Sequence, residues 1–521
     1  MSSHKSIIQS ASIIGIATLC SRLLGFIRDV VIARLFGVYV YAQAFVIAFR
    51  IPNLLRDLVG EGATNAAFVP VFTKFNAGHS KEEFWELANV VLNLLLVILM
   101  AITILGVIFS PLIVRLIAPG FVADPYKLET TIRLNRIIFP YILLISLAAY
   151  CVGVLNSLKH FIVPAFAPCL LNISVIIFAL LFGEGIKGLA LGVLVGGVLQ
   201  LAVQVPVLYK KGFRFKLFRN FRHPEAKTIG LLMVPRLFSS AIYQLNNFVD
   251  SIFGSLATIV GEGGVAVLYF AYRLIQFPLG IFSNALSQAI LPELSAQALE
   301  DGQDNLKRTL SFGLRAVFFV MLPASVGFIV LSRPIILGLF GGGRFDNYSA
   351  AMTADALLFY SLGLVAYGTT KILQTCFFAL KDTLTPAKVS VISLVMNIIL
   401  NAALMFPMKL SGLALATSIS GIITTLILFF ILQKKLHVFN SKEILISFVR
   451  ILVASITMGA ICFGVASQNI IIGDRTFARL LQLGLLLILG VISYAAFCLV
   501  FRVHEMQELW NWIRKRKQGR F

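Results

Sequence analysis

Charged residues are scarce in this chain of 521 residues. They make up 13% of the sequence, hydrophobic residues make up 59%, and the mean hydropathy is +0.92. These values exclude an ordinary soluble globular protein, in which about a quarter of the residues are charged. Apolar runs near twenty residues recur along the chain, and each could cross ~30 Å of hydrocarbon as a helix. The runs are continuous rather than alternating, so the sequence predicts an all-α polytopic membrane protein and not a β-barrel.

Groups that carry catalytic or metal chemistry are also few. The six cysteines lie in apolar segments without metal-like spacing, and the six histidines lie in loops, tails or helix ends. We therefore expect no disulfide and no cofactor. The chain has neither a Gly-rich phosphate loop nor a nucleophile–base set, which argues against a membrane glycosyl or phosphate transferase. The sequence indicates a transporter, not an enzyme. The first apolar run contains arginines and is too long for a cleavable signal peptide.

Fourteen transmembrane helices fit the apolar runs best, with a break near Gly60–Gly62 in the second. Their ranges are 7–36, 40–75, 85–110, 128–156, 163–182, 186–208, 228–256, 265–292, 306–332, 350–379, 385–405, 411–433, 445–467 and 477–502. The net charge is +21, and the basic residues concentrate in the loop after the sixth helix, the loop after the twelfth and the C-terminal tail. The positive-inside rule places these segments and both termini in the cytoplasm. The charge thus indicates topology and anionic headgroups rather than nucleic acid.

The chain contains an internal repeat with a nearly constant offset. In "NSLKHFIVPA", Lys159 and Pro164 match Lys381 and Pro386 of "FALKDTLTPA". "AAFVPVF" matches "QAILPEL" at the same offset, and "GLALG" matches "GLALA" at a slightly longer one. An even number of helices per copy predicts two parallel six-helix lobes around a central cavity, which alternate between two open states. A duplication without a moving cavity is the alternative.

The repeat predicts the domain organisation. The predicted parts are an N-lobe at 1–210, a basic cytoplasmic loop at 211–227, a C-lobe at 228–434, helices 13 and 14 at 445–502 and a basic cytoplasmic tail at 503–521.

Charged and polar side chains lie inside the first, second and eighth predicted helices. The candidate substrate-binding residues are Arg22, Arg28, Asp29, Asn53, Arg56, Glu61 and Arg273. On a helical wheel, Arg22, Arg28 and Asp29 share an arc of roughly 120°. An arginine at mid-bilayer costs ~2.5–3.5 kcal/mol, so these side chains must face protein or a wet cavity. Structural pairing of Arg28 with Asp29 is one reading, but adjacent helical residues point about 100° apart, which disfavours it. We predict a cationic cavity for an anionic substrate, because guanidinium binds phosphate bidentately.

Several motifs together resemble one family. "SRLLGFIRD", "PNLLRDLVGEGA", "AFVPVF", "APGF", "FPYILLISL" and "PAFAPCLLNIS" resemble the MurJ (MviN) lipid II flippase family of the multidrug/oligosaccharidyl-lipid/polysaccharide exporter superfamily. The resemblance spans nearly the whole chain. It implies two six-helix lobes plus two further helices that hold a lipid tail in a groove. It also implies a substrate, the undecaprenyl-diphosphate-linked muropeptide, moved from the inner to the outer leaflet of the bacterial cytoplasmic membrane. The implied partners are membrane lipids and the cell-wall synthesis machinery, around a monomeric transporter.

The resemblance also assigns roles to residues. The family's cavity arginines fall on Arg22, Arg28, Arg56 and Arg273, and Asp29 matches the acidic residue of the first motif. Some relatives carry acidic residues where this chain has Gln43 and Tyr272. Proton-coupling schemes that rely on those acids would therefore not apply here.

The resemblance implies a candidate sodium site in the second lobe. Its residues are Asp250, Asn397, Asn401 and Thr417, whose matching positions bind sodium in some relatives. Oxygen-only ligands with one carboxylate suit a hard cation. Asn401 stands where such relatives have a second carboxylate, which would weaken binding. The alternative is that Asp250 pairs with a cavity arginine.

Two further functions belong to the same superfamily. A drug/cation antiporter would have an acidic cavity, whereas the predicted cavity is basic. A lipid-linked O-antigen or capsule oligosaccharide exporter is the second alternative, and the first-helix motif favours the peptidoglycan branch over it.

Overall fold

The fold is described from a computed structural model. The described residues are 2–56, 67–183, 185–217, 223–300, 303–436, 441–468 and 476–507. Within these ranges the regular structure is helical, apart from one isolated bridge between Gly342 and Phe345. All six cysteines are unpaired in the structure. The chain divides into two compact units, Met1–Thr258 and Ile259–Phe521, and each is described by itself.

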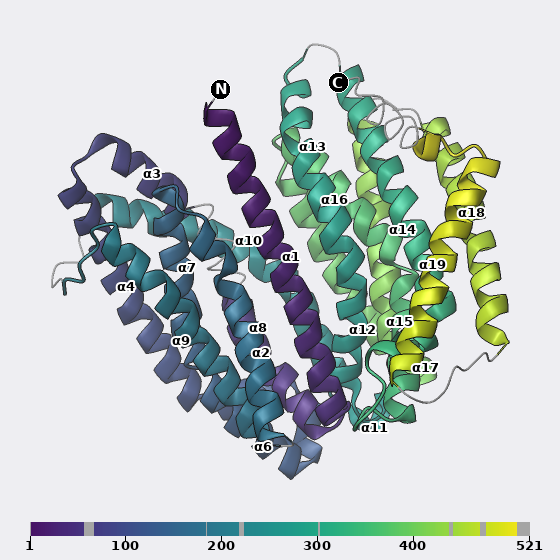
Figure 1. The fold of residues 1–521 in the computed structure, drawn as a ribbon, viewed down its shortest axis with the longest axis horizontal. Helices are drawn as coiled ribbons and strands as arrows, with labels where there is room; N and C mark the ends of the chain where they lie inside the picture. Colours follow the sequence, from purple (N-terminus) through teal and green to yellow (C-terminus); the bar gives the residue numbers. More distant parts are fainter. Residues whose placement is uncertain are drawn as a thin grey trace. The chain divides into compact units, whose positions relative to one another are not determined.

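The first unit contains ten α-helices and one short 3-10 helix in its described part (Figure 1). They are α1 (Ser2–Phe36), α2 (Val40–Arg56), α3 (Val69–Gly78), α4 (Lys81–Ile108), α5 (Ser110–Ile117), η2 (Pro119–Ala123), α6 (Pro125–Ile138), α7 (Tyr141–Ser157), α8 (Ile162–Phe182), α9 (Ile186–Lys210) and α10 (Pro224–Gly254). The short helix α11 (Ala257–Val260) spans the boundary between the units.

The described part of the second unit continues with α12 and ends with α19. Its elements are α12 (Gly264–Pro278), the π-helical turn η3 (Leu279–Ser283), α13 (Asn284–Gln297), α14 (Asp304–Leu339), α15 (Asn347–Ser361), α16 (Leu364–Ala379), α17 (Leu384–Lys435), α18 (Ser441–Ser467) and α19 (Thr476–Val500). The π-helical turn follows Pro278 directly, at a residue type that commonly disturbs a helix. Helices α18 and α19 both pack against α14 (Figure 1).

The predicted helices overlap observed helices throughout the described ranges, although their divisions differ. The range 128–156 is α6 and α7, the range 350–379 is α15 and α16, and two predicted helices form α17. By length and composition, nine helices of the described ranges could cross a membrane, or ten if α15 and α16 form one span bent by 44°. The protein is thus multi-pass and all-α, as predicted, while the count of fourteen stays a prediction.

The division between the units falls one helix later than the predicted lobe boundary. Helix α10, the predicted first helix of the C-lobe, clusters with the first unit. Gly120 of the "APGF" motif helps to explain this, because its N–H donates to Ser255 Oγ at 3.0 Å, just beyond the end of α10. A Cβ at Gly120 would lie 2.0 Å from the Ser255 carbonyl oxygen, so only glycine permits this approach. The lobes defined by the repeat remain a prediction.

The predicted repeat is visible in backbone geometry within each unit. Lys159 and Lys381, the pair matched in sequence, both have positive φ, at 58° and 59°. Each lies just after a helix and closes it with the same two bonds. The N–H of Lys159 donates to Asn156 O and that of the next residue to Leu155 O, and Lys381 repeats this pattern in the second copy. This is the Schellman pattern, in which glycine is usual.

Helix starts repeat as well. Asp124 accepts a hydrogen bond from Lys127 N at 3.1 Å, and Asp346 accepts one from Ser349 N at 2.8 Å. The two aspartates cap α6 and α15 at the same offset as the lysines, and each satisfies an amide that the helix leaves without a partner. Matching caps and turns in both halves support the duplication inferred from sequence.

The two copies differ in the length of the helix that leads to the break between their fifth and sixth predicted helices. Gly183 ends α8 with φ 55° and ψ −123°, and Lys409 interrupts α17 with φ 52° and ψ −131°. The same backbone conformation therefore occurs at both breaks. Since α8 and α17 begin at matching positions of the repeat, the later break shows that the second copy is about one helical turn longer there.

The ion pair of Asp382 provides a test of how the loop that follows α16 is held in the folded protein. Its carboxylate lies 2.7 Å from Lys435 Nζ at the end of α17, and it accepts hydrogen bonds from Thr385 N and Thr385 Oγ1. Lys435 and Thr385 lower the pKa of Asp382 to about 2. Asp382→Asn should lower thermal stability at neutral pH by ~0.2–1 kcal/mol, the range typical of a partly exposed ion pair.

The pH dependence of this loss follows from the direction of the pKa shift. Because the pKa of Asp382 is lower in the folded protein than in the unfolded chain, its ion pair stabilises the fold fully above the ordinary carboxyl pKa. This contribution disappears as pH falls from about 4 towards 2. Thermal unfolding of purified protein across this range should show wild type and Asp382→Asn converging at low pH. Lys434→Gln, at an exposed neighbour of Lys435, is the control. A difference that is constant with pH would contradict the assignment.

Candidate functional site

Arg28 of α1 forms the most complete polar cluster among the predicted site residues. Its Nε and Nη2 both donate to Asp29 Oδ1, at 3.0 and 2.7 Å, and its Nη1 donates to Asn172 Oδ1 at 3.1 Å. Asn172 lies on α8 and donates in turn to the Ser21 carbonyl of α1 at 3.1 Å. The cluster therefore ties α1 to α8 through polar groups.

The expectation that Arg28 and Asp29 would not pair is wrong. Adjacent helical residues do point apart, but the arginine side chain is long and turns back so that two of its nitrogens reach one carboxylate oxygen. Arg28 is 5% exposed and Asp29 is fully buried. Mutual neutralisation is what permits two charges at this depth.

Aromatic rings cover the guanidinium. The Cζ of Arg28 lies 5.6 Å from the centroid of the Phe49 ring of α2, a cation–π distance. Phe49 in turn stacks on Tyr141 at the start of α7, with centroids 6.0 Å apart. Helices α1, α2, α7 and α8 thus surround the charged pair with one amide and an apolar wall.

The structure describes the other predicted site residues of the first two helices only in part. Arg22 is exposed on α1, and Asn53 is half-buried on α2 with its Oδ1 buried and without a hydrogen-bond partner. Arg56 ends α2, and its side chain lies outside the described part of the chain. Glu61 lies in 57–66, also outside the described residues.

Arginine contacts extend to α10. Arg50 Nη1 of α2 donates to Ser251 Oγ of α10, and Asp250 is the residue before this serine. Asp250 is half-buried and belongs to the first unit. Asp250 is thus the sequence neighbour of a residue that contacts Arg50. Its alternative predicted role, as the partner of an arginine, stays a prediction.

Arg273 belongs to the second unit. It lies half-buried on α12, and its Nη1 donates to Gln276 Oε1 at 3.4 Å. Tyr272, which stands where some relatives have an acid, packs against Tyr360 with ring centroids 5.3 Å apart. The structure does not place Arg273 relative to Arg28, since they lie in different units.

Three of the four predicted sodium ligands meet on the two halves of α17. Asn401 Nδ2 donates to Asn397 Oδ1 at 3.0 Å, and Asn397 Nδ2 donates to Thr417 Oγ1 at 3.2 Å. Asn401 is fully buried, and its Oδ1 has no hydrogen-bond partner. These oxygens fit a hard cation in type, and the buried Asn401 oxygen is the one that the hydrogen-bond chain leaves unused. Among the described residues, no group of three His, Cys, Asp or Glu side chains could hold a metal.

Two polar residues that lie inside the spans were not among the site residues predicted from the sequence. Asn172 was quoted only within a motif, although an amide in the middle of the apolar run 163–182 is itself a signal. Lys371 is a half-buried cation in the middle of α16, within the apolar context "TTKILQTCFF". Both could have been found by scanning each span for single polar residues.

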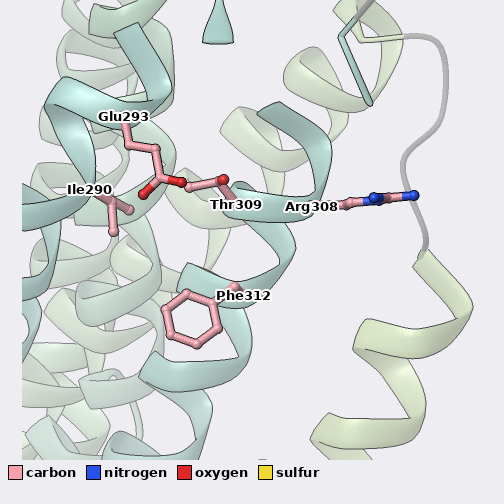
Figure 2. A pocket seen from close by; sticks show the side chains of 5 residues that line it. All are labelled: Ile290, Glu293, Arg308, Thr309 and Phe312. Atoms are coloured by element: carbon pink, nitrogen blue, oxygen red, sulfur yellow. The ribbon is translucent and has the colours of Figure 1, made fainter. Parts of the chain in front are cut away.

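The described pocket lies elsewhere. It has a volume of about 380 Å³, lies between α13 and α14 and is lined by Ile290, Glu293, Arg308, Thr309 and Phe312 (Figure 2). Figure 2 shows Arg308 extending away from the other four side chains. None of the predicted site residues lines this pocket, so it is not the predicted cationic cavity.

The apolar helices and the charged groups inside them define a polytopic membrane protein. The fold resembles that of a multidrug transporter of the MOP superfamily, titled "Inward-facing conformation of a multidrug resistance MATE family transporter", with a TM-score of 0.67. That match has 16% identity over 80% of this chain and 94% of the other, so it supports the fold alone.

Closer relatives identify the family. The sequence profile described as "Lipid II flippase MurJ" matches residues 32–474, and the chain belongs to this family. A "Probable lipid II flippase MurJ" of Buchnera aphidicola subsp. Acyrthosiphon pisum is 36% identical, over 89% of this chain and 91% of its own. The protein of the same name from Vibrio cholerae is 33% identical over 96% and 97%. The solved structure "Lipid II flippase MurJ, inward closed conformation" has a TM-score of 0.79 and 30% identity, over 94% and 98%.

These matches confirm the predicted family and fold class, and with them a transporter rather than an enzyme. The family and the apolar helices make the chain a multi-pass inner-membrane protein. The roles of the individual site residues stay predictions.

Removing one partner of the buried pair should destabilise the fold. Asp29→Asn leaves the Arg28 charge buried without its carboxylate, which typically costs ~3–5 kcal/mol. We expect a large fall in the thermal unfolding temperature of the purified protein. The double variant Arg28→Gln/Asp29→Asn should recover part of the loss, because it removes the unmatched charge. Arg22→Gln, at the exposed arginine of α1, is the control and should change stability by less than ~0.5 kcal/mol.

Proposed function

We propose that this protein is a flippase that moves the lipid-linked peptidoglycan precursor, lipid II, from the inner to the outer leaflet of the cytoplasmic membrane. The observation that carries the proposal is the match to proteins named lipid II flippase over nearly the whole chain, in sequence and in fold. No bond is made or broken. The diphosphate headgroup crosses through the protein while the polyprenyl tail stays in lipid.

The proposed route for the headgroup is a central cavity between two six-helix lobes, 1–210 and 228–434. Arg22, Arg28, Arg56 and Arg273 bind the diphosphate there, with Asp29, Asn53 and Glu61 positioning them. Guanidinium suits this role because it stays charged and offers paired donors to phosphate oxygens. Arg28 is supported by its contacts, since Asp29 and Asn172 fix the orientation of its guanidinium before any substrate arrives.

Charge sets the proposed orientation. The basic loops and tail lie in the cytoplasm, together with both termini. A cytoplasm-negative potential then favours outward movement of an anionic headgroup, by ~2.3 kcal/mol per charge per 100 mV. The drug/cation antiporter and the O-antigen or capsule exporter are not favoured by any observation on this chain.

Helices 13 and 14 have a separate proposed role. They correspond to α18 and α19, which pack on α14. We infer that they hold the polyprenyl tail in a lipid-facing groove while the headgroup enters the cavity. The protein acts as a monomer alongside the cell-wall synthesis machinery.

Sodium is the proposed coupling ion. Asn397, Asn401 and Thr417 would supply neutral oxygens, and Asp250 would supply the carboxylate. The unused, buried Oδ1 of Asn401 supports a cation at this place. The hydrogen bonds within the asparagine–threonine chain would have to rearrange for the other oxygens to bind.

Arg28 provides the sharpest functional test. In cells depleted of their own flippase, Arg28→Ala and Arg28→Lys should both reduce outer-leaflet lipid II, each by roughly tenfold or more, since a charge-assisted hydrogen bond contributes ~1.5–3 kcal/mol. Failure of the lysine variant would indicate paired donation rather than bare charge. Immunoblots must show wild-type amounts of each variant in the membrane. Arg133→Lys, at an exposed arginine paired with Glu129, is the matched control. Full outward exposure with Arg28→Ala would refute the cavity role.

The sodium proposal is tested by restoring a carboxylate. Asn401→Asp should tighten sodium binding several-fold, because cation affinity rises with the ligand charge. Thermal unfolding in sodium chloride and in choline chloride should show a larger sodium-specific stabilisation than in wild type. Asn172→Asp makes the same change at a buried asparagine outside the proposed site, and it should show no sodium-specific shift. Equal behaviour of the two variants would rule out sodium at Asn401.

A further inference from the structure

A short extended segment, Phe213–Leu217, follows α9 and is fixed along α4. Two buried asparagines of α4 hold its backbone. Asn89 Nδ2 donates to Arg214 O at 3.0 Å, and Asn89 Oδ1 accepts from Lys216 N at 2.8 Å. Asn93 Nδ2 donates to Lys216 O at 2.8 Å. The asparagine side chains thus pair with the segment much as a neighbouring strand would.

The position of these asparagines shows how deep the segment lies. Asn89 and Asn93 are two and three turns inside α4, whose apolar window qualifies it as a membrane span. Each is 2% exposed. Extended backbone at this depth needs internal hydrogen-bond partners, because hydrocarbon offers none. The two amides supply those partners and hold the segment at the border of the membrane.

The start of the segment is equally fixed. Gly212 has φ 106°, and the N–H groups of Gly212 and Phe213 close α9 on Tyr209 O and Leu208 O. Phe213 is 6% exposed and meets Trp85 of α4 edge-on, with ring centroids 5.7 Å apart. The segment is therefore attached by an aromatic anchor at one end and by the asparagines along its length.

The exposed face formed by this segment and the end of α9 is both basic and apolar. Lys210, Lys211 and Lys216 are exposed, and among them Phe215 is 48% exposed and Leu217 is 81% exposed. Arg214 faces back, since its Nη1 donates to the carbonyls of Tyr209 and Phe213. Three lysines beside two large apolar side chains form a surface with both elements that bind an anionic membrane face.

The second copy of the repeat is built differently at this place. Phe213 belongs to the buried cluster that contains Phe68, Val71, Leu87 and Val90. The residues that match those four in the second copy are Ile290, Glu293, Thr309 and Phe312, which line the open pocket of Figure 2. The positions of Asn89 and Asn93 carry Ser311 and Arg315. The second copy thus lacks, at the matching positions, the two asparagines that fix the segment in the first copy.

We propose that Lys210, Lys211, Lys216, Phe215 and Leu217 form a fixed docking surface for the headgroups of anionic phospholipids. The lysines bind the headgroup phosphates, and Phe215 and Leu217 enter the acyl boundary. Because Asn89, Asn93 and Phe213 already order the segment, binding requires little further loss of conformational entropy. The surface does not depend on lipid II transport, and it anchors the first unit to charged lipid.

Lipid binding to the purified full-length chain tests the proposal. Phosphatidylglycerol and phosphatidylethanolamine are titrated into the detergent-solubilised protein, and bound lipids are counted by native mass spectrometry. The triple variant Lys210→Gln/Lys211→Gln/Lys216→Gln should lose at least tenfold in phosphatidylglycerol affinity, since each lysine contributes about fivefold. Phosphatidylethanolamine binding should be unchanged, and the three Lys→Arg substitutions should retain binding.

A charge-matched control tests whether phosphatidylglycerol binding depends on this surface or only on the net charge of the protein. Arg115→Gln/Arg133→Gln/Lys187→Gln removes three other exposed cations of the first unit and should change the affinity by less than about twofold. Asn89→Ala/Asn93→Ala keeps every charge but releases the segment, and it should weaken phosphatidylglycerol binding. If that variant does not fold, the lysine variants alone decide.

Two outcomes would overturn the proposal. One is equal loss of phosphatidylglycerol binding in the lysine variant and the charge-matched control. The other is a lysine variant that loses binding of undecaprenyl diphosphate while keeping phosphatidylglycerol, which would assign the surface to the transported lipid. The Arg28 variants measure lipid II transport separately, so a failure of this proposal is distinguishable from a failure of the proposed function.

Discussion

Polar groups placed in hydrocarbon must find partners inside the protein, and the described structure depends on this constraint throughout. Arg28 meets Asp29 and Asn172, so a charged side chain becomes a link between α1 and α8. Asn401 donates to Asn397 along α17, and Asn397 donates to Thr417 beyond the break in that helix. Asn89 and Asn93 supply hydrogen-bond partners to the extended backbone of Phe213–Leu217. In each case an amide provides what water would provide elsewhere, and it fixes the relative position of two segments.

Duplication kept the backbone and changed the side chains. The lysine turns at 159 and 381 and the aspartate caps at 124 and 346 coincide in geometry. The residue after each lysine does not coincide, because His160 stands where the second copy has the Asp382–Lys435 ion pair. The closed cluster around Phe213 and the pocket between α13 and α14 differ in the same way. Similar frames therefore present different chemistry in the two halves.

The sequence predicted the helices well, because apolar runs of span length are a strong signal and their ends are marked by charge, proline and glycine. The family resemblance grouped Asn397, Asn401 and Thr417, and hydrogen bonds connect these three side chains in the structure, while their role as sodium ligands stays a prediction. The pairing of Arg28 with Asp29 escaped prediction because helical spacing describes where Cβ atoms point, not how far a long side chain can turn back. Asn172 could not be joined to Arg28 from sequence, because 144 residues separate them and only the packing of α1 on α8 brings them together.

The left-handed lysines have a consequence for how the chain assembles. A non-glycine residue in this conformation costs roughly 1 kcal/mol, and both copies retain it. The bonds that close each turn are local in the sequence, so they form without any contact from the rest of the lobe. In the first unit α7 packs mainly on α9 and α4 and makes few contacts with α8, so the turn sets the direction of the next helix without the two flanking helices packing along each other. Duplication of the gene thus also duplicated a self-contained corner that redirects the chain between two helices.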